Sequence, residues 1–153
     1  MKLTRRGELF AEFALGRYIV TALSDGYADV PFSNLLGENS CDRPGAPSAD
    51  STIRLQVNAF LIFSGKQHLL IDAGSANAWQ ATVGRLYDAL DEARVPRAKI
   101  GAVALTHSHV DHVNGLVTPV GAIAFTKPAS ILIHSNEVEL VRAEKRLAPA
   151  LQS

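Results

Sequence analysis

Three histidines and one aspartate stand within six residues of this chain. The group begins at His107, continues with His109 and ends with Asp111 and His112. Imidazole nitrogen and carboxylate oxygen are the ligands that zinc prefers in a catalytic site. The apolar run 100–105 comes directly before the group and is typical of a buried strand. The group is therefore expected at the exit of a strand, where loops carry function on a rigid scaffold.

The spacing of these residues suits two metal ions. Alternate side chains of an extended segment face the same way, so His107 and His109 can hold one ion as a pincer. Asp111 and His112 can reach a second ion about 3.5–4 Å away, the usual separation in a two-metal site. A cation lowers the pKa of its bound water to about 7, and Asp111 can orient the resulting hydroxide as well as hold a metal. The spacing disfavours the alternative, a polar loop with chance histidines.

The stretch 107–112 resembles the H-x-H-x-D-H signature of the metallo-β-lactamase fold superfamily. The stretch 70–74 is similar to the family's strand-end motif, whose aspartate, here Asp72, supports the metal site from behind. Three further segments resemble the family, two of them its lactonase-like and organophosphate-hydrolase-like branch: residues 21–26, 58–62 and 113–116. The resemblance runs from about Tyr18 to Leu147.

The resemblance implies a fold, an activity and a cofactor. The family fold is an αββα sandwich of two similar halves, and this chain corresponds to roughly the first. The expected class is α/β (α+β layered), with a mixed β-sheet and helices packed on one face. The implied function is a metal-dependent hydrolase, in which a metal-activated hydroxide attacks an ester, a lactone or a similar bond. Thioester hydrolysis of the glyoxalase II type is the neighbouring alternative. The implied cofactor is Zn²⁺, two ions per complete site, although His and Asp also suit iron, manganese or cobalt.

The resemblance also implies ligands that this sequence does not show. A complete site has a third histidine for the first metal, a bridging aspartate or cysteine, and a last histidine, all from the second half. His134 and His68 are expected to be a strand-end surface residue and a turn residue, and Cys41 an inert thiol in a loop. The second reading is thus a truncated, inactive metal-binding fragment, or a half-domain completed by another chain. Half a sandwich exposes apolar surface, which makes self-association through that face a further expectation.

Hydrophobic periodicity predicts the elements that position the motif. One partial domain, residues 1–153, is expected, with an extension at 1–17, a long loop at 30–52 and a core at 53–147. The expected strands are 18–23, 53–63, 68–72, 100–105 and 129–133, and the expected helices are 78–94 and 136–147. Ser24-Asp25-Gly26 is interpreted as a turn, and Trp79 as part of an apolar helix stripe. Phe32, Leu35 and Leu36 are candidates for an apolar wall of the substrate pocket.

Composition excludes several classes of protein. The 153 residues, 47% of them hydrophobic, suit one globular domain. Fifteen basic and fifteen acidic residues balance, so nucleic acid is not an expected partner. A membrane-spanning run and a signal peptide are not expected either, which makes the cytoplasm the expected location and a small-molecule substrate the expected partner.

Overall fold

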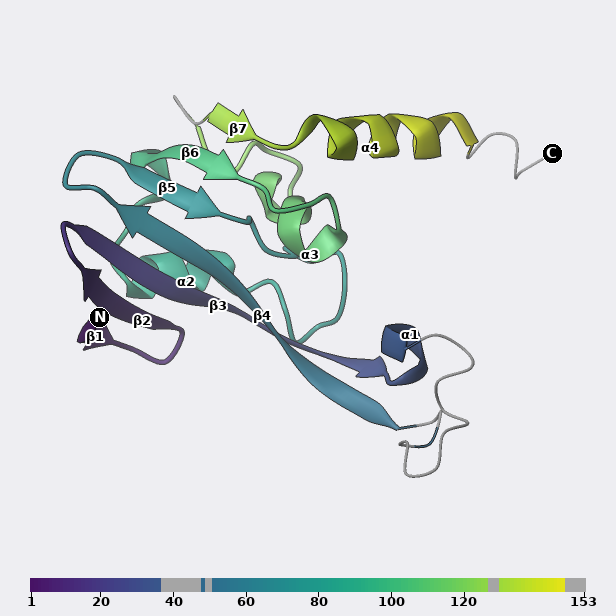
Figure 1. Cartoon of the computed structure of the whole chain (residues 1–153), viewed down its shortest axis with the longest axis horizontal. Helices are drawn as coiled ribbons and strands as arrows, with labels where there is room; N and C mark the ends of the chain where they lie inside the picture. The colour runs from purple at the N-terminus through teal and green to yellow at the C-terminus, as the bar shows by residue number, and fades with distance from the viewer. Residues whose placement is uncertain (37–47, 49–50, 127–129, 148–153) are drawn as a thin grey trace.

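The computed structural model of the chain describes residues 1–36, 48, 51–126 and 130–147. Seven strands of this part form one mixed sheet in chain order (Figure 1). They are β1 (Lys2–Arg6), β2 (Phe10–Leu15), β3 (Tyr18–Pro31), β4 (Thr52–Phe63), β5 (His68–Ile71), β6 (Ile100–Ala104) and β7 (Ser130–Leu132). Neighbours from β1 to β5 are antiparallel, and β5, β6 and β7 are parallel. The mixed sheet with helices confirms the predicted class.

The helices of the described part are short except for the last. They are α1 (Ser33–Leu36), α2 (Leu86–Glu92), α3 (Val110–Val113) and α4 (Ser135–Leu147), with 3₁₀ turns at Arg97–Lys99 and Asn114–Leu116. Figure 1 shows α2 behind β3, α3 beyond the ends of β5 and β6, and α4 reaching past β7. None of the helices in the described ranges is long and apolar enough to cross a membrane.

One face of the sheet forms the core together with α2. Alternate residues of the long strands point to this face, as a period of two requires. The buried side chains of the strands, Leu23, Leu61 and Leu70, pack against Leu86 and Leu90 of α2. The predicted hairpin of β4 and β5 is confirmed, and it contributes Ala59, Leu61 and Leu70 to this core.

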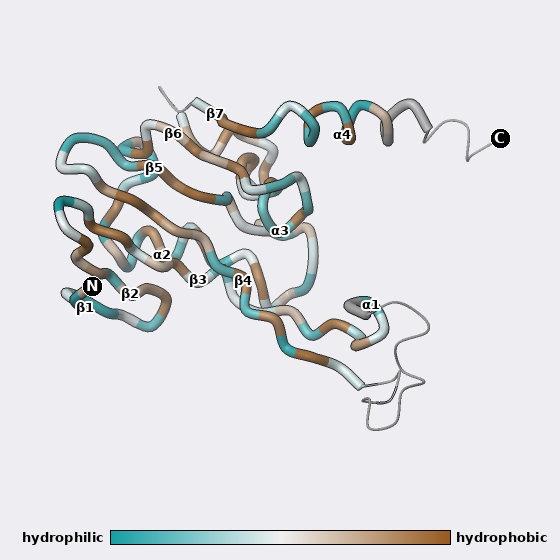
Figure 2. The backbone as a smooth tube through the Cα atoms, viewed as in Figure 1, coloured by the Kyte–Doolittle hydropathy of each residue, from teal (hydrophilic) through white to brown (hydrophobic). Residues whose placement is uncertain are grey.

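The opposite face of the sheet is apolar and uncovered in the described part of the chain. The strand register joins two rows of side chains that point away from the core. One row is Leu3, Phe13, Val20, Ile62, Leu69 and Ala102, and the other is Ala11, Ala22, Phe60, Ile71, Ala104 and Leu132. Phe60 is 43% exposed and Leu132 is 53% exposed. Figure 2 shows brown, hydrophobic stretches along these strands. Self-association through this face stays a prediction.

The sequence-based helix at 78–94 is wrong in its first half, because α2 begins only at Leu86. Side chains that would lie along that helix bond to the backbone of β3 instead. Gln80 exchanges two hydrogen bonds with the main chain of Asp29, both 2.9 Å long. Thr82 Oγ1 donates to the carbonyl of Tyr27 over 2.6 Å. These bonds hold the segment along β3, so the helical spacing of its apolar residues is coincidental.

The N-terminal third of the chain contains more sheet than expected. The predicted extension at 1–17 supplies β1 and β2, and the predicted strand 18–23 continues to Pro31. The expected turn at Ser24-Asp25-Gly26 is a bulge inside β3, where the register with β4 shifts. Most of the predicted long loop lies outside the described residues, but its start belongs to β3 and α1.

The bulge turns Asp25 into the core, where its side chain is 0% exposed. Its carboxylate accepts hydrogen bonds from the backbone N–H of Ser75 over 2.8 Å and of Leu86 over 2.9 Å. Burial raises the pKa of Asp25, and these hydrogen bonds oppose that rise. The second bond satisfies a free N–H at the start of α2, so Asp25 caps this helix from a distant strand. Asn77, which precedes the expected helix 78–94, does not cap α2, because α2 begins only at Leu86.

Replacing Asp25 with alanine is expected to destabilise the fold strongly. The change leaves two buried N–H groups without acceptors, at a cost of about 2–4 kcal/mol. The free energy of unfolding in urea measures the loss. Asp29→Ala is the matched control from the same strand, since it removes only an exposed ion pair with Arg54. Equal, small losses in both variants would show that Asp25 does not hold α2.

Candidate metal centre

The candidate site lies at the carboxyl ends of two parallel strands. Asp72 comes directly after β5, and Thr106 follows β6 by two residues. Because β5 and β6 run in the same direction, these ends meet at one edge of the sheet. The chain bends at Thr106 and again at His109, and α3 starts at Val110.

Asp72 is the polar centre of this edge and is 6% exposed. Its carboxylate accepts the backbone N–H of Thr106 over 2.8 Å and the hydroxyl of the same residue over 3.0 Å. Its other oxygen lies 2.9 Å from Nδ1 of His112. Its backbone φ is +63°, a conformation that few residues other than glycine, asparagine and aspartate adopt. Asp72 thus ties the end of β5 both to the end of β6 and to α3.

The structure brings the four predicted ligands together. The ring of His107 lies 4.0 Å from that of His112 and 4.5 Å from that of His109, between centroids. The carboxylate of Asp111 lies 3.2 Å from Nε2 of His112. Across the described ranges, no group of three or more His, Cys, Asp or Glu side chains is arranged to hold a metal ion. The ligand roles of these residues therefore stay predictions.

The donor set nevertheless fits a divalent cation in kind, because imidazole nitrogen and carboxylate oxygen are ligands that zinc prefers. A histidine whose Nδ1–H is held by a carboxylate presents Nε2 as a metal ligand, and Asp72 can hold His112 in this way. In that orientation Nε2 of His112 faces the carboxylate of Asp111 over 3.2 Å. Thr106 Oγ1 lies 3.1 Å from Nδ1 of His107, which leaves Nε2 of that ring free as well.

Backbone hydrogen bonds fix α3 against the loop after β5. The N–H of Ala73 donates to the carbonyl of His112 over 2.8 Å, and the N–H of Gly115 donates to the carbonyl of Gly74 over 3.0 Å. Tyr87 of α2 donates its hydroxyl to the carbonyl of Gly115 over 2.7 Å. A side chain at Gly115 would collide with the carbonyl of Ala73. The close approach of these loops explains the glycine after the motif.

A hollow of about 540 Å³ lies beside the motif. His109, Asp111, Ser108 and Val110 form one side, and the others are Val30, Asn34, Leu55 and Trp79. Trp79 is 38% exposed and lies outside α2, so its interpretation as part of an apolar helix stripe is wrong. Phe32 is half-buried and does not line the hollow, and the side chains of Leu35 and Leu36 lie outside the described residues.

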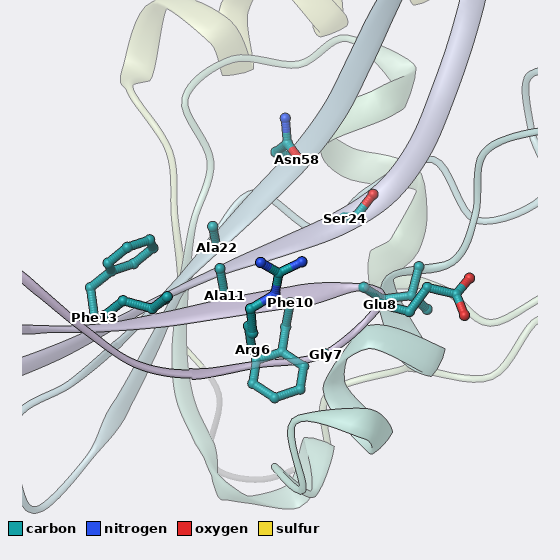
Figure 3. Close-up of a pocket in the computed structure, with 11 residues that line it drawn as sticks. Arg6, Gly7, Glu8, Phe10, Ala11, Phe13, Ala22, Ser24 and Asn58 are labelled. Carbon is teal, nitrogen blue, oxygen red and sulfur yellow. The ribbon is translucent and has the colours of Figure 1, made fainter.

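A second hollow, of about 380 Å³, shares no residue with the motif (Figure 3). It lies on the uncovered face of the sheet, and the labelled residues come from β1, β2, their connection, β3 and β4. Its two charged residues are Arg6 and Glu8, and Glu8 also lies 3.5 Å from Arg85. It offers no histidine or cysteine, so it provides no second candidate metal centre.

The remaining candidates from the sequence lie elsewhere. His134 is exposed, and its Nδ1 accepts the N–H of Asn136 at the start of α4. His68 begins β5 half-buried and stacks on Phe63, so the expected turn position is wrong. Burial lowers the pKa of His68. Cys41 lies outside the described residues.

Sequence reasoning missed three polar residues that shape the site: Asp25, Thr106 and Glu137. The carboxylate of Glu137, from α4, accepts both the N–H and the hydroxyl of Ser108, inside the motif. Thr106 could have been found as the polar residue that ends an apolar strand. No local signal pairs Glu137 with Ser108, because that contact joins segments 29 residues apart.

Comparisons with known proteins agree with this architecture. The sequence profile of the metallo-beta-lactamase superfamily matches residues 52–140, more than half of the chain. No curated protein matches the sequence. The hydrolase AbOPH, described as a beta-lactamase superfamily member, is similar with a TM-score of 0.73 and 23% identity, over 89% of this chain and 48% of its own.

Two further solved structures are similar. AidC, a dizinc quorum-quenching lactonase in complex with the product N-hexnoyl-L-homoserine, has a TM-score of 0.69 and 24% identity, over 86% of this chain and 46% of its own. A probable metal-dependent hydrolase from Staphylococcus aureus has a TM-score of 0.68 and 21% identity, over 86% and 52%. The chain thus spans about half the length of the structures it matches.

Replacing Asp72 with alanine is expected to cost more stability than replacing it with asparagine. Asparagine tolerates the left-handed backbone, whereas alanine adds a conformational cost of about 1–2 kcal/mol. Both variants lose the carboxylate that Thr106 and His112 contact. Urea unfolding of the metal-free protein measures the difference, with Asp91→Ala, at an exposed position of α2, as the control. Equal losses for both Asp72 variants would show that the backbone at this position is unstrained.

Proposed function

This chain belongs to the metallo-beta-lactamase superfamily, and we propose that it carries the metal-binding half of a metal-dependent hydrolase that acts on an ester, a lactone or a similar bond. The observation that supports this most is the gathering of His107, His109, Asp111 and His112 at one sheet edge, with Asp72 behind His112. Those residues would hold one or two ions, with zinc as the proposed metal.

Each residue has a distinct task in this proposal. His107 and His109 would bind one ion through imidazole nitrogen, and Asp111 and His112 would bind a second. A divalent cation bound there would lower the pKa of a water ligand to about 7 and polarise the group under attack. Asp72 keeps a proton on Nδ1 of His112, so Nε2 stays available. Asp111 would orient the attacking water and accept its hydrogen bond.

The hollow beside the motif supports a substrate with an apolar part. Val30, Leu55, Trp79 and Val110 offer an apolar wall next to His109 and Asp111. AidC is a lactonase whose product carries a hexanoyl chain, and an acyl lactone would suit a wall of this kind. We propose acyl lactones ahead of short esters, and thioesters as the neighbouring possibility.

A second function is a half-domain that binds metal without turnover, or one that another chain completes. One observation favours it: among the described residues, no group of three ligands is arranged to hold a metal ion. The uncovered apolar face would receive such a chain, with a second copy as the simplest candidate.

Removing one motif histidine is expected to weaken metal binding and to slow metal-dependent turnover strongly. After zinc reconstitution and gel filtration, His109→Ala should bind less zinc and hydrolyse an acyl homoserine lactone about a hundredfold more slowly than the parent chain, because losing a ligand costs at least as much as losing its support. His134→Asn is the control, since asparagine can still accept the N–H of Asn136. Metal content by elemental analysis and lactone opening by pH-stat are the measurements.

The zinc content and the turnover of the parent chain distinguish the two proposed functions. Zinc binding with turnover of a lactone, ester or thioester supports the hydrolase. Stoichiometric zinc without turnover, at every protein concentration tested, supports the half-domain. A parent chain that retains no zinc contradicts both.

Trp79→Ala is expected to lower activity on long-chain acyl lactones more than on short-chain ones. Losing the apolar wall should lower kcat/KM for a decanoyl lactone by about tenfold, the scale of a few methylene contacts, and leave a butanoyl lactone nearly unchanged. Measured kcat/KM values for the two lactones, with Trp79→Phe as the conservative variant, test this. Equal losses on both substrates would place the acyl chain elsewhere.

A further inference from the structure

Ser108 lies between His107 and His109 in the sequence, and it forms two hydrogen bonds to Glu137 of α4. Its N–H donates to the carboxylate of Glu137 over 2.9 Å, and its hydroxyl donates to the same oxygen over 2.7 Å. Two hydrogen bonds to one charged oxygen are strong and directional. They fix both the main chain and the side chain of the residue that sets the separation of His107 from His109.

Glu137 is poised for this contact by its place in α4. It lies in the first turn of that helix, where its own N–H donates to the carbonyl of His134 over 3.1 Å. The hydrogen bonds from Ser108 lower the pKa of Glu137, with a smaller contribution from His107 and His109, so the carboxylate is charged at neutral pH. Ser108 and Glu137 are both half-buried, which limits competition from water.

The rest of the described part of α4 makes no other side-chain hydrogen bond to the sheet or the motif. Arg142 of α4 pairs with Glu139 of the same helix over 2.8 Å. Figure 1 shows α4 leading away from the strands, with its first turn nearest to α3. The Glu137 contact is therefore the link through which this helix acts on the motif.

We propose that Glu137 is a positioning residue that holds Ser108 so that His107 and His109 close on one metal ion. The proposal rests on the proposed function for its metal, but the contact itself does not need one. Glu137 does not bind the ion, and its effect passes through the backbone of Ser108. Without it, the segment from 106 to 109 loses the two hydrogen bonds that join it to α4.

Four variants separate the effect of holding Ser108 in place from the effect of the negative charge of Glu137. Glu137→Ala removes the acceptor, and Glu137→Gln keeps an oxygen at the same place without the charge. Ser108→Ala removes one of the two donors and keeps the backbone bond. Glu139→Gln, two residues along α4, is the matched control, because the side chain of Glu139 hydrogen-bonds only to Arg142 among the described residues. Thermal unfolding followed by circular dichroism checks that each variant folds.

The first measurement is the affinity for Co²⁺, followed by its visible absorption and by competition with Zn²⁺. Glu137→Ala should bind about 10–100-fold more weakly, the usual effect of losing a residue that orients a ligand. Glu137→Gln should stay within a few-fold of the parent, and Ser108→Ala should fall between. An unchanged Glu137→Ala overturns the proposal. An equal loss in Glu137→Gln overturns it in favour of a direct effect of charge.

The second measurement needs no metal and separates this proposal from the proposed function. The Ser108 amide should exchange with solvent at least about tenfold faster in metal-free Glu137→Ala than in the parent, because its hydrogen bond is lost. Glu137→Gln should leave the rate close to that of the parent. If the parent binds no metal but the Ser108 amide responds in this way, the proposed function fails and the positioning contact stands. An unchanged exchange rate in Glu137→Ala overturns the contact itself.

Discussion

One buried carboxylate joins the sheet to the candidate metal centre. Asp72 accepts hydrogen bonds from the N–H and hydroxyl of Thr106 and lies 2.9 Å from His112. Parallel strands bring β5 and β6 to the same edge, but the pairing alone leaves the loops beyond them without fixed directions. A charged acceptor shared by both loops supplies those directions, since a buried carboxylate without donors would be costly. The left-handed backbone of Asp72 is held in place by the same contacts.

A second carboxylate, Asp25, supports the layer behind the site. It joins β3 to Ser75 and to the start of α2, and Tyr87 of α2 then reaches the carbonyl of Gly115 beyond the motif. The site therefore depends on β3 and α2 as well as on the ends of β5 and β6. Glu137 adds a third carboxylate from the C-terminal side. Each of these aspartate and glutamate side chains accepts backbone N–H groups, so each fixes main-chain geometry as well as side chains.

The hydrophobic pattern of the sequence predicted those elements whose signal lies within a few neighbouring residues. The alternation in β4 and the apolar run of β6 were both readable from neighbours in the sequence. The failures are long-range. Trp79 and Val83 have helical spacing, yet Gln80 and Thr82 bond to β3 and keep the segment unwound. Asp25 lies in Ser24-Asp25-Gly26, a sequence typical of a turn, yet the bulge in β3 buries its side chain. Glu137 gave no signal, because its partner lies 29 residues away.

The tautomer of His112 tests the role of Asp72 most directly. Long-range ¹H–¹⁵N correlation spectra of the metal-free protein, at a pH above the usual histidine range, show which ring nitrogen carries the proton. If Asp72 orients the ring, the proton of His112 is on Nδ1 and Nε2 is free, and Asp72→Ala loses this preference. A proton on Nε2 in the parent chain would mean that Asp72 does not prepare His112 for a metal, and would contradict the arrangement described above.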